Sequence, residues 1–489
     1  MTKARDLSLA SKLPLAGGTL TGNLVTKGIT SVTLGSNNLV AGSTAGDSIT
    51  SGGNGNTLLG TNAGTAVTTG GNNVSVGYNS LSSNTTAGAN VAVGYQTMLT
   101  NITGAENTAI GYEALKFNTT GSYNTASGLM ALKANTTGSY NTASGYHALK
   151  SNTTGTDNVA VGVSTLQTNT TGIRNEALGN GALYSNTSGG NNVGIGRQAL
   201  YSNTTASSNI AVGGNALFAN TTGPNNTAVG GTALMSNTTG WNNTATGMEA
   251  MKANTTGVNN VAAGKAALLA NTTGGANVAI GYQALDANTT GTDNVAVGKD
   301  AMTTNTTGIY NTACGQNAMY SHTTGNRNSG FGSHALSGTT TGTYCTAIGF
   351  NAQSSSATAS EQMTLGDANI SNLRCNDTSI SSLSDSRDKT SVIDSPYGLD
   401  FINTVRPVQF LWNTRDGNAK DGSTRIGFLA QELLAATNGN NATLDLVMDD
   451  NPDKLEAKYG NLLPIMVQAI QELSTQNAAL AARITALEA

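Results

Sequence analysis

The hydrophobic and polar positions of this chain recur every seventeen residues between about residue 50 and residue 370. The run from Asn277 to Asp293 reads NVAIGYQALDANTTGTD, and the neighbouring runs differ from it only slightly. The glycine of its first apolar cluster recurs at 19 positions from Gly60 to Gly366, with no insertion or deletion. A fixed period of this length predicts a repeat architecture.

Each unit has two short apolar clusters and is too short for a pair of helices. The text N-[VT]-A-[VI]-G predicts a five-residue strand, and the following x-x-A-L predicts a second short strand. Asn-Thr-Thr-Gly predicts a closing turn, because Asn and Gly tolerate positive φ. We therefore predict a mainly β protein with a parallel β-roll or β-solenoid shaft. The Val/Ile and Ala-Leu side chains are expected inside, with Thr and Asn ladders on the turns.

Composition excludes several classes of protein and marks one boundary. Gly accounts for 61 of 489 residues, Pro for 6 and charged residues for 10%, a balance unlike that of disordered chains. The net charge of −4 and the lack of a basic stripe argue against a nucleic-acid partner. Residues 384–489 hold 23 of the 50 charged side chains, which places a domain boundary near residue 384.

Cysteine usage and the N-terminal text bear on cofactors and location. Cys314, Cys345 and Cys375 are odd in number and far apart, so we expect unpaired thiols and no metal site or cofactor. Cys314 takes the Val/Ile position before Gly315, where a buried thiol is expected. The chain shows no signal peptide and no apolar run of 18 residues, so we expect synthesis in a cytoplasm and no membrane insertion.

Other interpretations of the repeat fit the residues less well. An ice-binding surface needs flat Thr arrays, and calcium-binding β-rolls need a recurrent Asp that the repeat lacks. A polysaccharide hydrolase needs two carboxylates about 5–10 Å apart, and a pair such as Asp286 with Asp300 could approach by stacking of the coils. The acidic residues of the shaft fall mostly at variable positions, which favours solvated turn residues: Glu106, Glu113, Asp157, Glu176, Glu249, Asp286, Asp293 and Asp300.

The repeat resembles the head domains of trimeric autotransporter adhesins and, more closely, repeat regions of bacteriophage tail fibres. The segment LPLAGGTLTGNLV at residues 13–25 resembles a short element that recurs in phage tail-fibre proteins. These resemblances imply a homotrimer and an N-terminus that binds other phage tail proteins. We assign residues 1–50 to an attachment segment, 51–370 to the shaft, 371–383 to a linker and 384–489 to a C-terminal α+β domain.

The last thirty residues predict a helix with a continuous heptad pattern. Ile and Leu mixtures with one polar Asn are typical of a parallel coiled coil whose register the Asn fixes. A single amphipathic helix packed on its own domain is the alternative, because three to four heptads are near the lower limit. The predicted trimer seam consists of Leu463, Met466, Ile470, Leu473, Asn477, Leu480, Ile484 and Leu487.

The stretch SDSRDK at residues 384–389 combines two serines with four charged residues. Because residues 384–489 contain no His, a Ser-His-Asp triad within that domain is excluded. A serine with a lysine general base stays open, since a desolvated Lys can lose its proton and activate a hydroxyl. Ser384 and Lys389 are five residues apart, and spacing alone makes this pair a weak candidate.

Three blocks in order carry a further resemblance: S-D-x-R-x-K at 384–389, G-F-x-A-Q-E at 427–432 and Y-x-x-L-x-P-x-x-x-x-A-I-Q-E-L at 459–473. Together they resemble the C-terminal intramolecular chaperone, the self-cleaving peptidase S74 domain, of endosialidase tailspikes and other phage fibres. The resemblance implies trimerisation, folding of the β-structured body in register, and cleavage between Leu383 and Ser384. It implies Ser384 as nucleophile and Lys389 as general base, with cleavage in cis or in trans left open. Asp385 and Arg387 are expected to form a supporting ion pair.

The sequence therefore predicts a phage tail fibre or related virion appendage that recognises a host-surface receptor, a glycan or an outer-membrane component. No catalysis is expected of the mature shaft, and the autoprotease would act once. A tailspike depolymerase acting on a host polysaccharide is the alternative. A bacterial surface adhesin is disfavoured by the absence of a signal peptide and a membrane anchor in this text.

Overall fold

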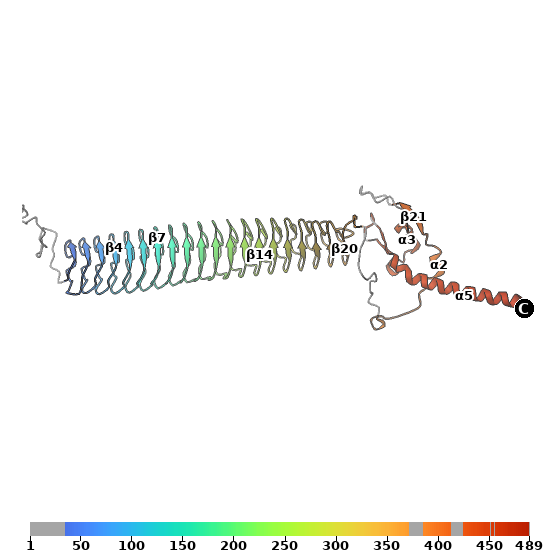
Figure 1. Cartoon of the computed structure of the whole chain (residues 1–489), viewed down its shortest axis with the longest axis horizontal. Helices are drawn as coiled ribbons and strands as arrows, with labels where there is room; N and C mark the ends of the chain where they lie inside the picture. The colour runs from blue at the N-terminus through green and yellow to red at the C-terminus, as the bar shows by residue number, and fades with distance from the viewer. Residues whose placement is uncertain (1–34, 371–384, 412–423, 450, 454, 489) are drawn as a thin grey trace, which may run out of the picture. The chain divides into compact units, whose positions relative to one another are not determined.

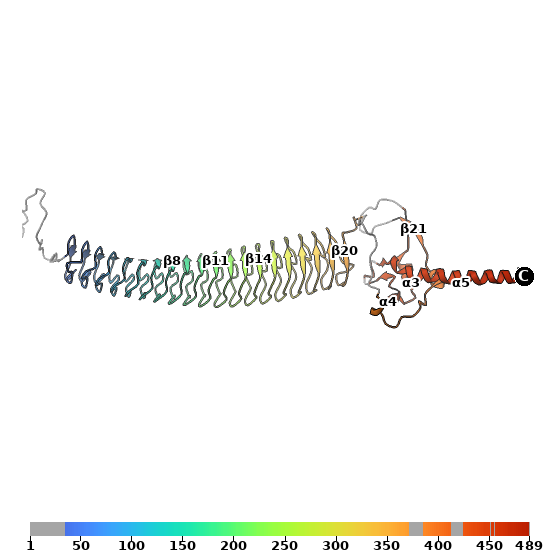
Figure 2. The same ribbon diagram turned by 60° about the horizontal axis from the view of Figure 1, so that its bottom comes forward.

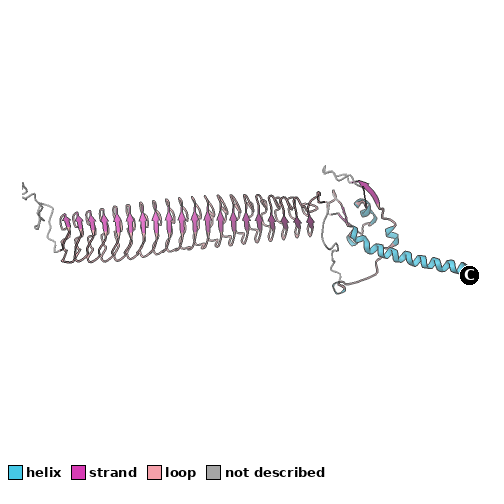
Figure 3. Cartoon of the chain, in the orientation of Figure 1, coloured by secondary structure: helices cyan, strands magenta, loops and turns pink. Residues whose placement is uncertain are grey.

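A computed structural model describes residues 35–370, 385–411, 424–449, 451–453 and 455–488. The chain forms two compact units, with the division between Asp300 and Ala301. Most of the predicted attachment segment, the predicted linker, Cys375 and the Leu383–Ser384 bond lie outside the described residues. The fold is mainly β, and the helices of the described chain follow residue 384 (Figure 3).

The first unit is a parallel β-solenoid in which each coil contributes one three-residue strand (Figure 1). From β2 on, successive strands of this unit pair with a shift of 17 residues, as Val193 pairs with Ile210 and Ile195 with Val212. Between β1 and β2 the shift is 18 residues, since Leu39 pairs with Thr57. The first strand already lies within the range assigned to the attachment segment. The strands are β1 Leu39–Ala41, β2 Thr57–Leu59, β3 Val74–Val76, β4 Val91–Val93, β5 Thr108–Ile110, β6 Thr125–Ser127, β7 Thr142–Ser144, β8 Val159–Val161, β9 Glu176–Leu178, β10 Val193–Ile195, β11 Ile210–Val212, β12 Thr227–Val229, β13 Thr244–Thr246, β14 Val261–Ala263, β15 Val278–Ile280 and β16 Val295–Val297.

The second strand predicted for each unit is wrong. Ala284 and Leu285 are adjacent and both fully buried, whereas neighbours in an extended strand point to opposite faces. The backbone turns here instead, with φ of 52° at Gln283 and 53° at Leu285. The left-handed residues let both side chains point inward. Hydrogen bonds between coils continue through the turn, as from the Leu268 N–H to the Ala284 oxygen at 3.0 Å.

The predicted placement of the Val/Ile side chains is also wrong, because the strand is turned the other way. In β15 the central Ala279 is fully buried and Ile280 is 43% exposed. Where the turn carries a Leu, that side chain lies opposite the centre of the strand and the central residue is small, whereas Leu58 at the centre of β2 belongs to a coil whose turn has Ala63 and Gly64 instead. At Gly194 an added Cβ would lie 3.4 Å from Leu183 Cδ1. For the same reason Cys314, in an outward position, is exposed and not buried as expected.

Two ladders of buried Asn side chains run through the solenoid, inside the coils and not only on their turns. In one ladder, Asn135 Nδ2 donates to Asn118 Oδ1 at 2.8 Å and to the Gly138 oxygen at 2.9 Å. In the other, the Asn141 N–H donates to Asn124 Oδ1 at 3.1 Å. These amides are fully buried, and their mutual hydrogen bonds offset the cost of desolvation.

Thr side chains and the periodic glycines complete each coil. The predicted Thr ladder is present, for example between Thr136 Oγ1 and the Thr153 oxygen at 3.0 Å. Gly281 has a φ of +138°, and an added Cβ there would lie 2.3 Å from the oxygen of Gly298 in the next coil. Both the backbone conformation and the close approach therefore require glycine at this corner.

The second unit starts with four further strands of the same type and continues into an α+β domain (Figure 2). Its solenoid strands are β17 Thr312–Cys314, β18 Ser329–Phe331, β19 Thr346–Ile348 and β20 Met363–Leu365. The domain that follows contains η1 Ser386–Asp388, α2 Leu399–Ile402, β21 Val408–Leu411, β22 Thr424–Gly427, α3 Ala430–Ala436, α4 Asn441–Leu444, β23 Val447–Met448, β24 Glu456–Ala457, η2 Tyr459–Asn461 and α5 Leu462–Glu488.

A small apolar core holds this α+β domain together. The hairpins β21–β22 and β23–β24 are antiparallel, and the short helices lie beside them. The start of α5 contributes Leu462, Ile465 and Ala469 to the buried interior. The core side chains are Phe401, Leu433, Leu444, Leu446, Val447, Leu462 and Ile465.

Candidate functional site

The loop of the SDSRDK stretch is shaped by its acidic and basic residues. Asp385 accepts a hydrogen bond from the Arg387 N–H at 2.9 Å and so caps the short helix η1. The Arg387 guanidinium turns back onto the same carboxylate, with Nη2 2.6 Å from Oδ2. This hydrogen bond lowers the pKa of Asp385 and raises that of Arg387. The predicted supporting residues thus form an ion pair on the surface of the loop.

Lys389 ends the helix η1 and returns the backbone to an extended conformation. Its N–H donates to the Ser386 oxygen at 3.3 Å, and the residue is exposed. The predicted nucleophile, Ser384, precedes the described loop and lies outside the described residues. Capping by Asp385 fixes the path of the backbone from Asp385 to Lys389. The Ser384–Lys389 pair stays a prediction.

The other two blocks of the three-part motif contact each other within the domain. The Tyr459 hydroxyl lies 3.3 Å from both the N–H and the oxygen of Phe428, and the two rings pack edge to face at 5.4 Å. An added Cβ at Gly427 would come 2.8 Å from that hydroxyl. The motif residues at 427–428 and 459 therefore pack against each other inside the domain, a role that the sequence did not indicate.

Two carboxylates of the same blocks connect helices and loops of the domain. Glu472 on α5 accepts a hydrogen bond from the Leu399 N–H at 2.7 Å, at the start of α2. This backbone hydrogen bond lowers the pKa of Glu472. Glu432 on α3 forms an ion pair with Arg406, with Arg406 Nε 3.0 Å from Glu432 Oε2. Both acids thus serve the architecture of the domain.

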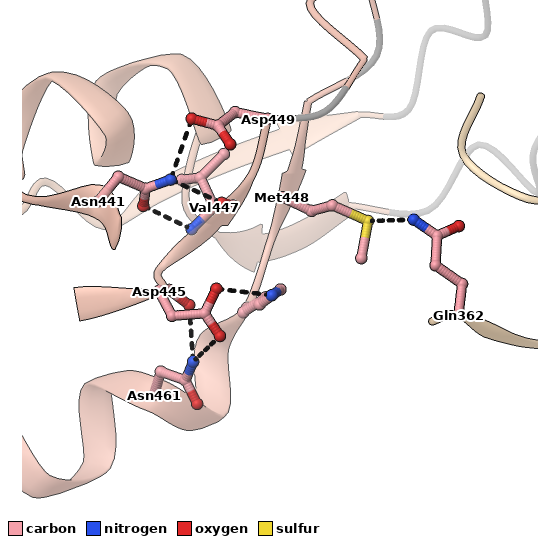
Figure 4. A network of polar contacts seen from close by, with 8 residues as sticks. Gln362, Asn441, Asp445, Val447, Met448, Asp449 and Asn461 are labelled. Carbon is pink, nitrogen blue, oxygen red and sulfur yellow. Dashed lines mark hydrogen bonds and ion pairs between the residues drawn. The ribbon is translucent and has the colours of Figure 1, made fainter. Parts of the chain in front are cut away.

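The domain also contacts the last coil of the solenoid within the second unit (Figure 4). Gln362 Nε2 lies 3.5 Å from Met448 Sδ on β23, and Asn451 Nδ2 donates to the Ser355 oxygen at 2.8 Å. Beside this contact is a cleft of about 680 Å³ lined by residues of β20 and by Glu456. The hairpin β23–β24 therefore lies against the C-terminal end of the shaft.

Polar contacts fix the loop that presents Met448. Asn441 Nδ2 donates to the Val447 oxygen at 2.8 Å (Figure 4). Asp445, at a φ of 46°, accepts from Lys458 Nζ at 2.7 Å. Its backbone oxygen accepts from Asn461 Nδ2 at 2.6 Å. The start of α5 and the shaft contact are thereby joined by one network.

The predicted seam residues lie on the surface of α5, away from the core of the domain. Leu463 and Ile470 are each 64% exposed and Leu487 is 84% exposed. The helix runs from Leu462 to Glu488 without interruption. Since Leu462, Ile465 and Ala469 already supply the buried side, the heptad side is free for association with another helix.

The acidic residues of the shaft that form ion pairs do so with lysines of the shaft. Burial raises the pKa of Glu113, but hydrogen bonds from Lys116 and Lys133 outweigh it and lower the pKa overall. Asp286 differs, because burial raises its pKa and the charge of Asp300 adds to the effect. In the described part of the chain, no group of three or more His, Cys, Asp or Glu side chains is arranged to hold a metal ion.

Comparison with known proteins identifies the C-terminal part of the chain. Residues 384–441 match the family model described as chaperone of endosialidase, of the Peptidase S74 type. Comparison with curated proteins and with solved structures finds no match. Among the helices of the described residues, none has the length and apolar character needed to cross a membrane. A β-solenoid followed by this domain fits a tail fibre or tailspike with a C-terminal chaperone.

Proposed function

We propose that this protein is a phage tail fibre that recognises a host-surface receptor, and that its C-terminal domain drives trimerisation and then removes itself. The match of residues 384–441 to the chaperone of endosialidase, directly after a solenoid, is the observation that carries this proposal. The receptor is a glycan or an outer-membrane component. The N-terminal segment attaches the fibre to other tail proteins of the virion.

Trimerisation is supported by the apolar surface that the single chain leaves open. The heptad side of α5 exposes Leu, Ile and Met side chains along the helix. Exposed apolar stripes of this length are typical of coiled-coil partners. The contact of β23–β24 with the last coil would transmit the alignment of three such helices to the shaft.

The cleavage is a peptide-bond hydrolysis in two steps. The Ser384 hydroxyl oxygen attacks the carbonyl carbon of Leu383, and its proton passes to the Lys389 amine, which acts as general base. The proton then goes to the leaving amino group, so that an ester replaces the peptide bond. Water hydrolyses the ester and restores the hydroxyl. Removal of residues 384–489 makes the trimer kinetically trapped, since the shaft separated from its C-terminal domain cannot retrace the folding path.

Expression of the full chain tests the autoprotease. We expect one fragment ending at Leu383 and one starting at Ser384 by denaturing electrophoresis and mass spectrometry. Ser384→Ala and Lys389→Met should stay intact, because the first lacks the nucleophile and the second lacks the base. Ser386→Ala, which changes the neighbouring serine in η1, is the matched control and should cleave. Cleavage of Ser384→Ala at the wild-type rate would contradict the assignment.

A depolymerase is the second candidate, favoured by Asp286 and Asp300. Glycosidases need one carboxylic acid with a raised pKa beside a second carboxylate. Burial, and then the charge of Asp300, raise the pKa of Asp286 in this way. The cleaved trimer should bind host cells without releasing reducing ends from their polysaccharide. Release that is lost in Asp286→Asn would establish the depolymerase instead.

A further inference from the structure

The outward side of the solenoid strands is almost free of charge. We call the first and third residues of β1–β16 the strand face. These positions hold Val, Ile, Leu, Thr, Ser and Ala, with Glu176 as the one charged residue among them. Around Glu176 the face is apolar, with Leu178 50% exposed and Ile210 41% exposed. A carboxylate at this place needs an explanation.

A charged residue of the opposite sign lies in the same coil, at a position that varies between repeats. Arg174 precedes Glu176 by two residues, with the buried Asn175 between them. Both charged side chains are exposed, and their side chains make no ion pair or hydrogen bond within the described chain. The equivalent positions one coil before and one coil after Arg174 are Asp157 and Asn191. The coil of β9 therefore presents a positive and a negative side chain that have no partner among the residues that the structure describes.

A repeat this regular gives packed copies no unique alignment. A slip of one coil would bring each outward side chain beside the Val, Thr or Ile of the next repeat, at little cost. Glu176 breaks this degeneracy. In register, the Glu176 carboxylates of neighbouring copies adjoin one another at the level of their Arg174 guanidinium groups, whose positive charge offsets the repulsion between the carboxylates. After a slip Glu176 would face Val159 or Val193, at the level of Asp157 or Asn191. A covered carboxylate without a partner is strongly unfavourable.

We propose that the strand face packs against the strand faces of two further copies of this chain, and that Glu176 and Arg174 of neighbouring copies form the ion pair that sets their register. This inference rests on the proposed trimer. Glu176 is the lone charge of the strand face and the exposed Arg174 lies two residues before it, so the two groups can complement each other between copies, which indicates another copy of the chain as the partner. The pair remains in the shaft after residues 384–489 are removed.

The register can be measured with disulfides between differently tagged chains. One chain carries Val193→Cys and the other Thr227→Cys, two coils further along. At about 4.8 Å per coil, these positions lie about 10 Å apart along an in-register stack, too far for a disulfide. Disulfides between two Val193→Cys chains show that the faces adjoin. Both cysteines are introduced into a chain without its own cysteines, which carries Cys314→Ser, Cys345→Asn and Cys375→Ser.

We expect the wild-type pair to give disulfides only between identical positions. Glu176→Val should raise the disulfide between the two different positions about tenfold, because slipped trimers no longer bury an unpaired charge. The exchange of both charges, Arg174→Glu with Glu176→Arg, should restore the wild-type pattern. Glu249→Val removes a carboxylate from another side of the coil and is the matched control, expected to keep the wild-type pattern.

Native mass measured on the same samples separates this inference from the proposed function. A trimer in which Glu176→Val keeps the wild-type pattern would overturn the role of the ion pair. A trimer without disulfides between identical strand-face positions would overturn the packing of this face and leave the tail-fibre proposal standing. A monomeric full chain would overturn the trimer itself and the inference with it.

Discussion

At the scale of single residues, the stability of the shaft depends on polar side chains in its interior. Asn152 Nδ2 donates to Asn135 Oδ1 at 2.8 Å and to the Gly155 oxygen at 3.0 Å, while Asn152 Oδ1 accepts from Asn169 at 2.8 Å. A buried group that loses its partner costs about 1–3 kcal/mol. Each rung of the ladder is therefore tied to both neighbouring coils.

Asn152→Ala should open the coils around it. The change leaves Asn135 Oδ1 without its donor, whereas the Gly155 oxygen keeps its hydrogen bond from Asn141 and Asn169 Nδ2 keeps its bond to the Gly172 oxygen. We therefore expect a local loss of about 1–3 kcal/mol. Hydrogen exchange of residues 135–172, followed by mass spectrometry, measures the opening free energy. Ser151→Ala at the half-buried neighbouring position should have little effect. Equal protection in both variants would contradict the importance of the ladder.

His322 replaces an Asn in the same ladder and makes one coil sensitive to acid. It is fully buried, with Nε2 donating to the Gly325 oxygen at 2.8 Å and Nδ1 without a partner. Burial lowers the pKa of His322 below its ordinary value of 6.5. The unfolded coil thus binds a proton more readily than the folded coil. The contribution of neutral His322 to the stability of its coil is therefore complete above the pKa that His322 has in the unfolded chain. It is lost as the pH falls through the lower pKa that His322 has in the folded coil.

We expect amide protection of the coils around His322 to fall between pH 7.5 and pH 5, and to fall less elsewhere in the shaft. His322→Asn restores the amide of the repeat and should remove this local pH dependence. Hydrogen exchange at the two pH values, corrected for the intrinsic rate, is the measurement. A variant with the same local loss as the wild type would show that another group titrates.

At the scale of elements, the sequence predicts the repeat and its inter-coil pairing better than the course of each coil. Period and strand position follow from the spacing of the glycines. The turn at Ala284-Leu285 could not be inferred in this way, because Leu rarely adopts positive φ and the left-handed conformation costs about 1–2 kcal/mol. Here the fully buried Leu285 offsets that cost, at φ 53°. Adjacent Ala and Leu in many of the units were the signal that an extended strand does not fit.

The C-terminal helix is the element for which the sequence predicted the exposed apolar side most directly. A heptad spacing predicts which side of α5 is apolar, and the structure places Leu463 and Ile470 on the exposed side. The roles of Tyr459 and Glu472 depend on contacts with Phe428 and Leu399, far apart in the chain. Periodicity carries no information about such contacts.

Ile470→Glu should prevent trimer formation of the full chain. Its side chain is 64% exposed in the single chain and would lie in the seam of the coiled coil. Three charges in one layer of an apolar seam repel each other and are desolvated. Native mass of the variant in an uncleaved Ser384→Ala background should shift from trimer to monomer. Gln471→Glu, one residue off the seam, is the control and should stay trimeric.

At the scale of the whole molecule, the repeat by itself hardly distinguishes one register between copies of the chain from another. Two features of the chain would set that register. The C-terminal helix acts from outside the solenoid and is expected to leave after cleavage. The coil of β9 acts within the shaft and stays. The change in composition near residue 384 separates the repeat region from the C-terminal domain, and the match to the family model begins at the same residue.

The period of seventeen residues has a genetic consequence. From β2 to β16, each coil pairs with its neighbours in the same register, as β10 pairs with β9 and β11. A recombination event between two repeats therefore adds or removes whole coils while every ladder closes again across the new joint. The length of the shaft can drift in steps of one repeat during evolution without any compensating substitution. Lineages that must cross surface layers of different thickness could adjust their reach in this way, while the ends of the chain stay unchanged.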